Sequence, residues 1–118
     1  MHSKRDIQAL LDQMTAANRA GDADACAKLF TSEAQLHSPF GPAAVGRDAI
    51  RRVHKEWTAE ANTKGFAIID HGSSNDMAWC LARFSEGDAA GGGSSLIVLE
   101  KQSDMRWLIR ACCLYEDE

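Results

Sequence analysis

The sequence predicts an α+β fold in which helices pack against an antiparallel sheet, and three observations predict this class. Apolar residues recur at helical intervals of three and four in the first half of the chain. From about residue 66 onward they gather in strand-like runs rich in Ile, Val, Leu, Trp and Phe. The 118 residues, 45% of them apolar and 25% charged, suffice for one core. We therefore expect a single domain over residues 1–118.

A first helix is predicted over residues 4–20, because four apolar side chains share one helical face and Gly21 follows as a stop signal. These four are Ile7, Leu10, Leu11 and Met14. Asp22 is suited to cap a second, shorter helix, which we expect to continue through Leu29 and Phe30.

A strand is expected over residues 34–38. The following stretch, residues 39–42, predicts a turn, because its two prolines fix φ and lack the backbone donor. A third amphipathic helix begins after Gly46 and closes near residues 62–65. Its predicted inner face carries Ile50, Val53, His54, Trp57 and Ala61.

Four strands are predicted in the second half of the chain, and they should pair as an antiparallel meander. They span residues 66–72, 77–85, 95–101 and 106–115. The Gly-rich stretch 87–93 between the second and third of them is long for a hairpin loop. We expect it to be the most mobile segment.

Nucleic acids and membranes are not expected as partners. The net charge is −4, and Lys and Arg are scattered rather than gathered into the basic stripe that binds phosphate backbones. No apolar stretch approaches the roughly 20 residues that cross a bilayer, and the first residues lack a signal-type apolar block. The expected location is the cytoplasm.

Neither a metal nor another cofactor is expected, because no His-x-x-x-His or Cys-x-x-Cys pair occurs. The four cysteines stand in apolar runs, where cysteine behaves as a small hydrophobe, and we expect buried free thiols. They are Cys26, Cys80, Cys112 and Cys113. The last two are neighbours in a predicted strand, so their side chains should point to opposite faces.

Several short motifs spread over nearly the whole chain carry a resemblance to a known superfamily. They are Asn18-Arg19-Ala20-Gly21-Asp22, Leu29-Phe30, His37-Ser38-Pro39-Phe40-Gly41-Pro42, Gly46-Arg47-Asp48-Ala49-Ile50 and Arg106-Trp107-Leu108-Ile109. With them the chain resembles the superfamily of ketosteroid isomerase, the SnoaL-like polyketide cyclases and nuclear transport factor 2. The resemblance implies a cone-shaped, curved antiparallel sheet with three helices packed on its concave face. It also implies a cavity for a small molecule, and it identifies a fold rather than a reaction.

The residues of ketosteroid isomerisation are missing at the matching positions. In ketosteroid isomerase-like proteins a carboxylate takes a proton beside a ketone, while a Tyr and a protonated Asp hold the enolate oxygen. The resemblance places Met14 at the position of the Tyr, Ser38 at that of the base and Ile97 at that of the second acid. We therefore do not expect this isomerisation.

His54 and Ser38 are the candidate catalytic residues. His54 lies on the helix face that should cover the cavity, where an imidazole can bind a ligand oxygen or shuttle a proton. Ser38 should face inward with Leu36, and it needs a base such as His54 to act as a nucleophile. A histidine at the edge of the helix, hydrogen-bonded to the backbone, is the alternative for His54.

Apolar residues of several elements should form the walls of the cavity. Met77, Trp79, Leu81 and Arg83 alternate on one face of the second predicted meander strand. The resemblance implies that this face lines the cavity, and Arg83 would then pair with a ligand carboxylate. An Arg that reaches solvent or Glu100 is the alternative. The candidate ligand-binding residues are Met14, Phe30, Leu36, Trp57, Trp79, Leu81, Arg83 and Ile97.

Three functions stay open at this point. The first is a protein that binds a small apolar or aromatic molecule, with or without a carboxylate. The second is a small cofactor-independent enzyme using His54 for acid–base chemistry, and the third is a non-catalytic dimerisation module. A homodimer is expected through an apolar outer sheet face. The predicted residues of this face are Ala78, Cys80, Ala82, Phe84, Leu96 and Val98.

Overall fold

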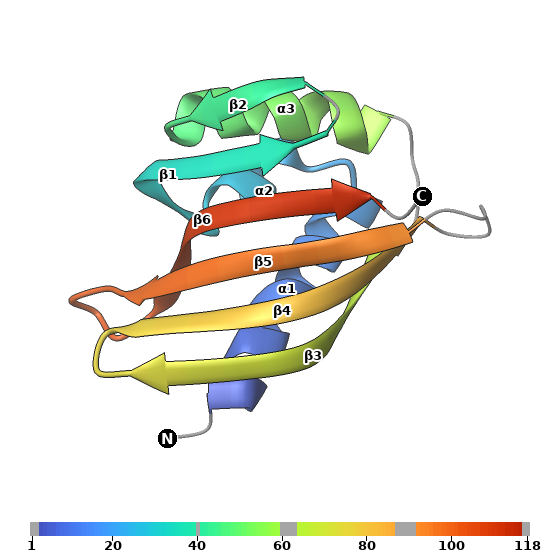
Figure 1. Cartoon of the computed structure of the whole chain (residues 1–118). Helices are drawn as coiled ribbons and strands as arrows, with labels where there is room; N and C mark the ends of the chain where they lie inside the picture. The colour runs from blue at the N-terminus through green and yellow to red at the C-terminus, as the bar shows by residue number, and fades with distance from the viewer. Residues whose placement is uncertain (1–2, 40, 60–63, 87–91, 117–118) are drawn as a thin grey trace.

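A computed structural model describes residues 3–39, 41–59, 64–86 and 92–116 (Figure 1). Three helices and six strands occur in this part of the chain. In chain order they are α1 (Ser3–Arg19), α2 (Ala23–Ala27), β1 (Phe30–Ser38), β2 (Gly41–Val45), α3 (Arg47–Ala59), β3 (Lys64–Ser74), β4 (Met77–Glu86), β5 (Gly92–Lys101) and β6 (Trp107–Glu116). The strands form one sheet in the order β2-β1-β6-β5-β4-β3.

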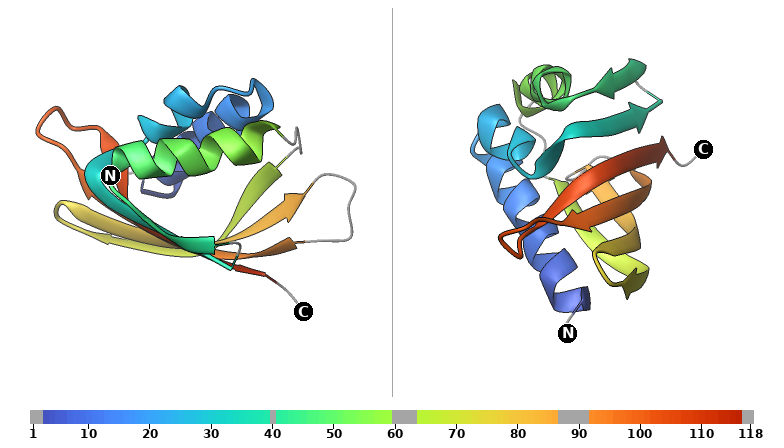
Figure 2. Two further views of the ribbon diagram at one scale, coloured as in Figure 1. Left: turned by 90° about the horizontal axis from the view of Figure 1, so that it is seen from above. Right: turned by 90° about the vertical axis from the view of Figure 1, so that its left-hand side faces the viewer.

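The sheet curves around one layer of helices, which confirms the predicted α+β class. Figure 2 shows the helices together on the concave side of the sheet. Helix α1 packs against β3, and α3 packs against β1 and β2. The predicted meander is confirmed, since β3, β4, β5 and β6 pair with their neighbours in antiparallel fashion. The sheet is not antiparallel throughout, because β1 pairs with β6 in parallel.

The first half of the chain contains more strand than predicted. Helix α2 ends at Ala27, and β1 already begins at Phe30. The predicted turn at residues 39–42 is also wrong in its second half, where Pro42 belongs to β2. This position is compatible with proline because β2 is the edge strand of the sheet and needs fewer backbone donors.

Two further expectations concern segments that lie mainly outside the described residues. Helix α3 is described to Ala59. Of the predicted helix end near residues 62–65, residues 62–63 lie outside the described residues, and the prediction is wrong for Lys64 and Gly65, which already belong to β3. The predicted mobile loop 87–93 is described only from Gly92 onward, where β5 begins.

The predicted apolar face of α1 is confirmed. Its four apolar residues are at most 5% exposed, and they pack with the inner face of the sheet and with α3 into one core. The largest contributions from the strands are Phe30, Ile97, Leu99 and Ile109, each at most 1% exposed. This core therefore lies between α1 and the concave face of the sheet.

The two faces of β4 are the reverse of those predicted. Ala78, Cys80, Ala82 and Phe84 are buried, whereas Trp79 is 40% exposed and lies on the convex outer face. The register explains this, since Cys80 pairs with the fully buried Ile97 of β5. Both faces of β4 are apolar, so alternation alone does not identify the inner one. The prediction is correct for Leu96 and Val98 of β5, which are exposed and half-buried respectively.

The four cysteines are free thiols, and three of them are buried as expected. Cys112 points inward and Cys113 outward, which confirms that the two neighbours face opposite sides of β6. Cys113 is exposed, so the expectation of burial is wrong for this residue. Among the described helices, none has the length and apolar character needed to cross a bilayer.

Candidate functional site

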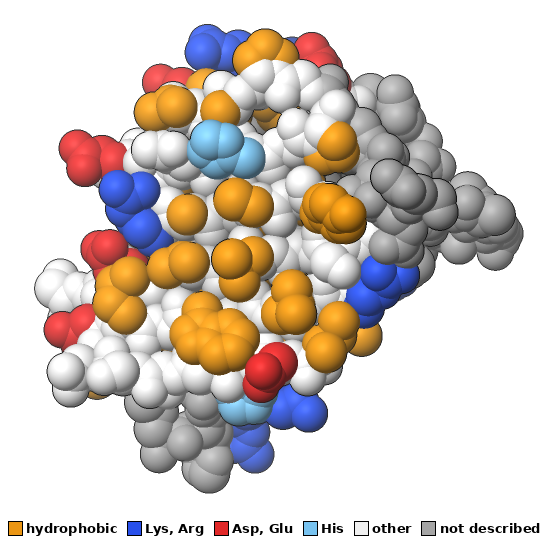
Figure 3. Space-filling model, in the orientation of Figure 1, with side chains coloured by type: hydrophobic (Ala, Val, Ile, Leu, Met, Phe, Trp, Pro, Cys, Tyr) orange, Lys and Arg blue, Asp and Glu red, His pale blue; other side chains and the backbone are white. Residues whose placement is uncertain are grey.

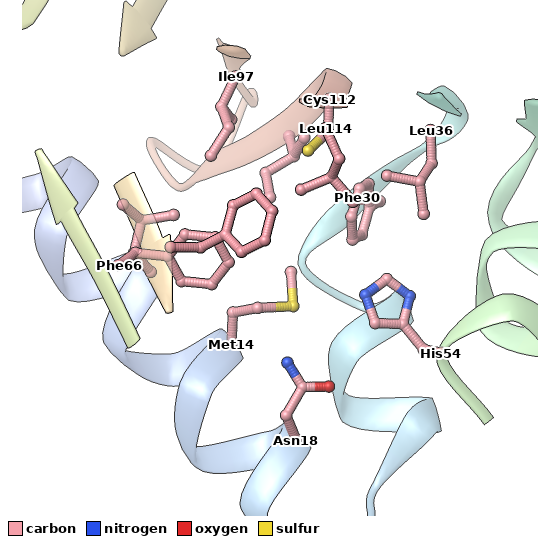
Figure 4. A pocket seen from close by; sticks show the side chains of 12 residues that line it. Met14, Asn18, Phe30, Leu36, His54, Phe66, Ile97, Cys112 and Leu114 are labelled. Carbon is pink, nitrogen blue, oxygen red and sulfur yellow. The ribbon is translucent and has the colours of Figure 1, made fainter. Parts of the chain in front are cut away.

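A small apolar cavity lies between α1, α3 and the concave face of the curved sheet. Its free space is about 40 Å³. The described residues that line it are Leu11, Met14, Asn18, Phe30, Leu36, His54, Phe66, Phe84, Ile97, Ile109, Cys112 and Leu114 (Figure 4). Helix α1, helix α3 and five strands each contribute to this lining, so the cavity exists only in the folded chain.

Four of the predicted ligand-binding residues line this cavity. They are Met14, Phe30, Leu36 and Ile97, each at most 5% exposed. Met14 follows Ile7, Leu10 and Leu11 on the apolar face of α1, and Ile97 belongs to the inward set of β5. The side chain of the predicted Trp57 lies outside what the structure describes. Contact of these walls with a ligand stays a prediction.

His54 also lines the cavity, as expected from its position on α3. Its side chain is 3% exposed, and its Nδ1 lies 3.0 Å from the carbonyl oxygen of Ile50, one helical turn earlier. Because a carbonyl only accepts, Nδ1 carries the proton of this bond, and the neutral ring then has its lone pair on Nε2. The ring also packs at a tilt against Phe30, with 5.5 Å between the ring centroids.

Asn18 is the second buried polar side chain of the cavity, and the sequence interpretation assigns it no role in the site. It is 9% exposed, and its Oδ1 accepts a hydrogen bond from Cys26 Sγ at 3.4 Å. Figure 4 shows the amide beside Met14, with His54 on the neighbouring wall. A signal exists in the sequence: Asn18 follows Met14 by four residues and Leu11 by seven, which places it on the apolar face of the first helix.

The buried thiols near the cavity are poor nucleophiles. Burial raises the pKa of Cys112 to about 12, although Ser95 Oγ lies 3.3 Å from its sulfur. Burial, followed by the charge of Asp22, raises the pKa of Cys26 to about 11. Nucleophilic attack requires the thiolate, so both groups are inert thiols at neutral pH.

Ser38 is not brought into this cavity. It ends β1 and lines a separate hollow between β2 and α3, together with Ala44, Arg52 and Val53. His54 is not among the described residues that line this second hollow. The structure therefore gives no support to a Ser38–His54 pair.

Trp79, Leu81 and Arg83 do not line the cavity, so their predicted placement is wrong. They share the outer face of β4, where Leu81 pairs with Leu96 and Arg83 with Ser94 of β5. Arg83 is exposed, and its Nη1 donates to Ser94 Oγ at 3.3 Å. A ligand carboxylate inside the cone therefore does not meet Arg83.

The described lining of the cavity carries no Asp, Glu, Lys or Arg side chain. Its polar groups are the amide of Asn18, the imidazole of His54 and the thiol of Cys112. Likewise, no cluster of three potential metal ligands occurs among the described residues. Such a lining suits an apolar molecule with one or two hydrogen-bonding atoms.

Solved structures with the same fold support this architecture. A ketosteroid isomerase-like protein from Erwinia carotovora atroseptica SCRI1043 shares 21% identity with the chain, at a TM-score of 0.81, over 97% of this chain and 95% of the other. An NTF-2-like protein of unknown function from Shewanella oneidensis MR-1 shares 23% identity at a TM-score of 0.80, over 95% and 98%. A domain of unknown function with a cystatin-like fold from Nostoc punctiforme PCC 73102 shares 17% identity at a TM-score of 0.82, over 98% and 77%.

These likenesses concern the fold alone, because every identity is below 25%. No curated protein matches the sequence. The sequence pattern of the SnoaL-like domain, however, matches residues 9–107, which is most of the chain and includes the larger part of α1, all of α3 and most of the sheet. The chain therefore belongs to the SnoaL-like domain family.

Proposed function

We propose that the protein binds a small apolar or aromatic molecule in the cavity between α1, α3 and the sheet. One observation carries this proposal: two buried polar side chains, Asn18 and His54, converge on an otherwise apolar cavity. Hydrogen bonds inside the protein, from Cys26 to Asn18 and from His54 to Ile50, offset the cost of burying these two polar groups beside the cavity. A pocket with few convergent polar groups is the usual form of a small-molecule site.

The size of the cavity restricts the ligand. Its free space of about 40 Å³ is well below the roughly 150 Å³ of an engineered cavity that takes up benzene. A compound of a few heavy atoms fits with small adjustments, and a larger one has to displace side chains. Met14 is suited to such a movement, because its unbranched thioether side chain adapts its shape easily.

The test compares a filled cavity with an intact one. Ile97→Phe puts additional volume into the cavity, whereas Leu96→Phe adds the same ring to the neighbouring, outward position, which is 47% exposed. Ligands are first identified by native mass spectrometry and by ligand-observed NMR with a fragment library. Binding that persists in Leu96→Phe and disappears in Ile97→Phe, with circular dichroism unchanged in both, supports the proposal. Equal binding by both variants contradicts it.

A second candidate function, acid–base catalysis, is favoured by the orientation of His54. The Ile50 carbonyl fixes Nδ1, as expected of an imidazole that exchanges a proton at Nε2. The described lining offers no carboxylate as a partner, which favours binding over turnover. His54→Gln distinguishes the two: an enzyme retains its ligand and loses turnover, whereas a binding protein loses affinity. His37→Gln, an exposed change on β1, is the matched control.

We also propose a homodimer through the convex face of the sheet. Figure 3 shows apolar side chains gathered over the middle of this face, and Met77, Trp79, Leu96 and Tyr115 are each at least 40% exposed. Patches of this kind mark association sites. Asp70 of β3 is exposed and pairs with Leu81 of β4, the strand that also carries Arg83. A twofold pairing of two copies can bring the Asp70 carboxylate of each copy to the Arg83 guanidinium of the other.

A further inference from the structure

A hydrogen bond from Cys26 to Oδ1 fixes the orientation of the Asn18 amide. The sulfur of Cys26 lies 3.4 Å from Asn18 Oδ1, and Cys26 is fully buried. Because burial raises the pKa of this thiol to about 11, it keeps its proton and donates it to Oδ1. The Nδ2 group of the amide therefore occupies the other side, and Figure 4 shows it directed toward Met14 and the cavity.

The turn between α1 and α2 holds this pair in place. Asp22 caps α2 by accepting the Ala25 N–H at 3.0 Å, and its own N–H donates to the Ala17 carbonyl at 2.9 Å. The N–H of Cys26 donates to the Asp22 carbonyl at 3.2 Å. Asn18 and Cys26 thus stand on two elements joined by a short, hydrogen-bonded connection, so the amide is presented to the cavity in a defined direction.

The described lining around this amide lacks a permanent charge. An anionic ligand would lose its hydration without gaining a counter-charge, and such burial is expensive. The described lining therefore favours a neutral ligand over an anionic one.

We infer that the cavity selects compact, neutral compounds with a carbonyl oxygen, that Asn18 recognises this oxygen through its Nδ2 hydrogens, and that Cys26 positions Asn18. This inference rests on the proposed binding function and adds the ligand class to it. Asn18 contacts the ligand, whereas Cys26 acts through Asn18. The inference also replaces the carboxylate ligand expected from Arg83.

Three probes with six heavy atoms each test this selectivity: cyclopentanone, methylcyclopentane and cyclopropanecarboxylate. Affinities are measured by ligand-observed NMR at pH 8 and pH 6, and the side-chain amide signals of Asn18 are followed in ¹⁵N-labelled protein. The inference predicts that cyclopentanone binds best and shifts the Asn18 amide signals. The carboxylate is expected to bind at least tenfold more weakly at both pH values.

Two substitutions separate recognition from packing. Asn18→Leu keeps the size of the side chain and removes its donors, so cyclopentanone should lose about tenfold in affinity, as expected for one hydrogen bond, while methylcyclopentane keeps its affinity. Cys26→Ser retains a donor to Oδ1 and Cys26→Ala does not. Cyclopentanone should therefore bind to the serine variant nearly as well as to the wild type, and more weakly to the alanine variant.

The outcomes distinguish the inference from the proposed function. If none of the probes and no fragment binds, the binding function fails, and the inference fails with it. If the carboxylate binds as well as the ketone at both pH values, the binding function stands and the inference is overturned. Equal losses for ketone and hydrocarbon in Asn18→Leu would also overturn it, because they indicate a packing role.

Discussion

Trp79 lies against Gly72 on the convex face of the sheet, where the two residues are paired across β3 and β4. A Cβ added at Gly72 would lie 2.6 Å from Trp79 Nε1 and 3.0 Å from its Cε2, closer than real side-chain contacts allow. The indole therefore lies over the backbone of β3 in a place that only glycine leaves open. Glycine covered by a neighbouring aromatic ring is a known way to compensate for the missing side chain in a strand.

The first prediction concerns this contact. Gly72→Ala should displace the indole of Trp79 from β3, because methyl group and ring cannot share the space. The chain has three tryptophans, so the emission of Trp79 has to be isolated. It is obtained by subtracting the fluorescence of a Trp79→Phe variant, once in the wild-type background and once in the Gly72→Ala background, and the two differences are compared. Circular dichroism should stay unchanged, since the core lies on the other face. An emission difference below the experimental error would contradict this account.

The second prediction concerns self-association. Trp79→Lys should convert the proposed dimer into a monomer at micromolar concentration, because it places a charge in the middle of the apolar outer face. Met105→Lys is the matched control: Met105 is 69% exposed and lies in the turn between β5 and β6. Light scattering coupled to size exclusion gives the mass. A wild-type monomer, or a dimer that persists in Trp79→Lys, would exclude this interface.

The sequence predicts the inner face of a helix or strand only where the apolar residues are confined to one side of that element. The face of α1 is predictable because only one side of this helix is apolar, and all four of its expected core residues are buried. In β4 both sides are apolar, and the inner one is chosen by packing. The inner face consists of small residues, Ala78, Cys80 and Ala82, and Cys80 pairs there with Ile97. Trp79 lies on the outer face, because its ring needs the space that Gly72 leaves free.

The candidate site was predictable to the same degree. His54 and Met14 belong to amphipathic helices, so their inward position follows from their period. The role of Asn18 depends on the bond to Cys26, which joins two helices across a turn, and no local pattern encodes this contact. The position of Ser38 depends on β2, a strand that the two prolines obscure in the sequence.

The third prediction concerns the thiols. In the monomeric Trp79→Lys variant a disulfide-exchange reagent should label Cys113 alone, since Cys113 lies beside Leu96 on the proposed dimer face and the other three thiols are buried. The pKa of Cys80 is raised from 9.0 to about 11 by burial, so its contribution to stability is complete below pH 9. Above pH 9 the unfolded chain loses this proton first, and stability falls up to about pH 11.

Urea unfolding at pH 8, 9 and 10 measures this dependence. Cys80→Ala should flatten the decline, because the variant has one fewer thiol to ionise on unfolding, whereas Cys113→Ala should leave the slope unchanged. Parallel slopes in wild type and Cys80→Ala would show that the burial of Cys80 does not control the response.

The fourth prediction concerns Met14, which lines the small cavity and is 5% exposed. Met14→Ala should lower the free energy of unfolding by about 2–5 kcal/mol, the range of buried Met-to-Ala changes, because it removes apolar contacts and leaves a void. Met77→Ala on the outer face is the control, and since Met77 is 43% exposed its effect should be within about 0.5 kcal/mol. The enlarged cavity should also take up benzene, which raises the melting temperature of Met14→Ala and leaves Met77→Ala unchanged. If benzene stabilises both variants equally, it binds outside this cavity. If Met14→Ala is as stable as the wild type, the cavity wall collapses around the smaller side chain without loss of stability.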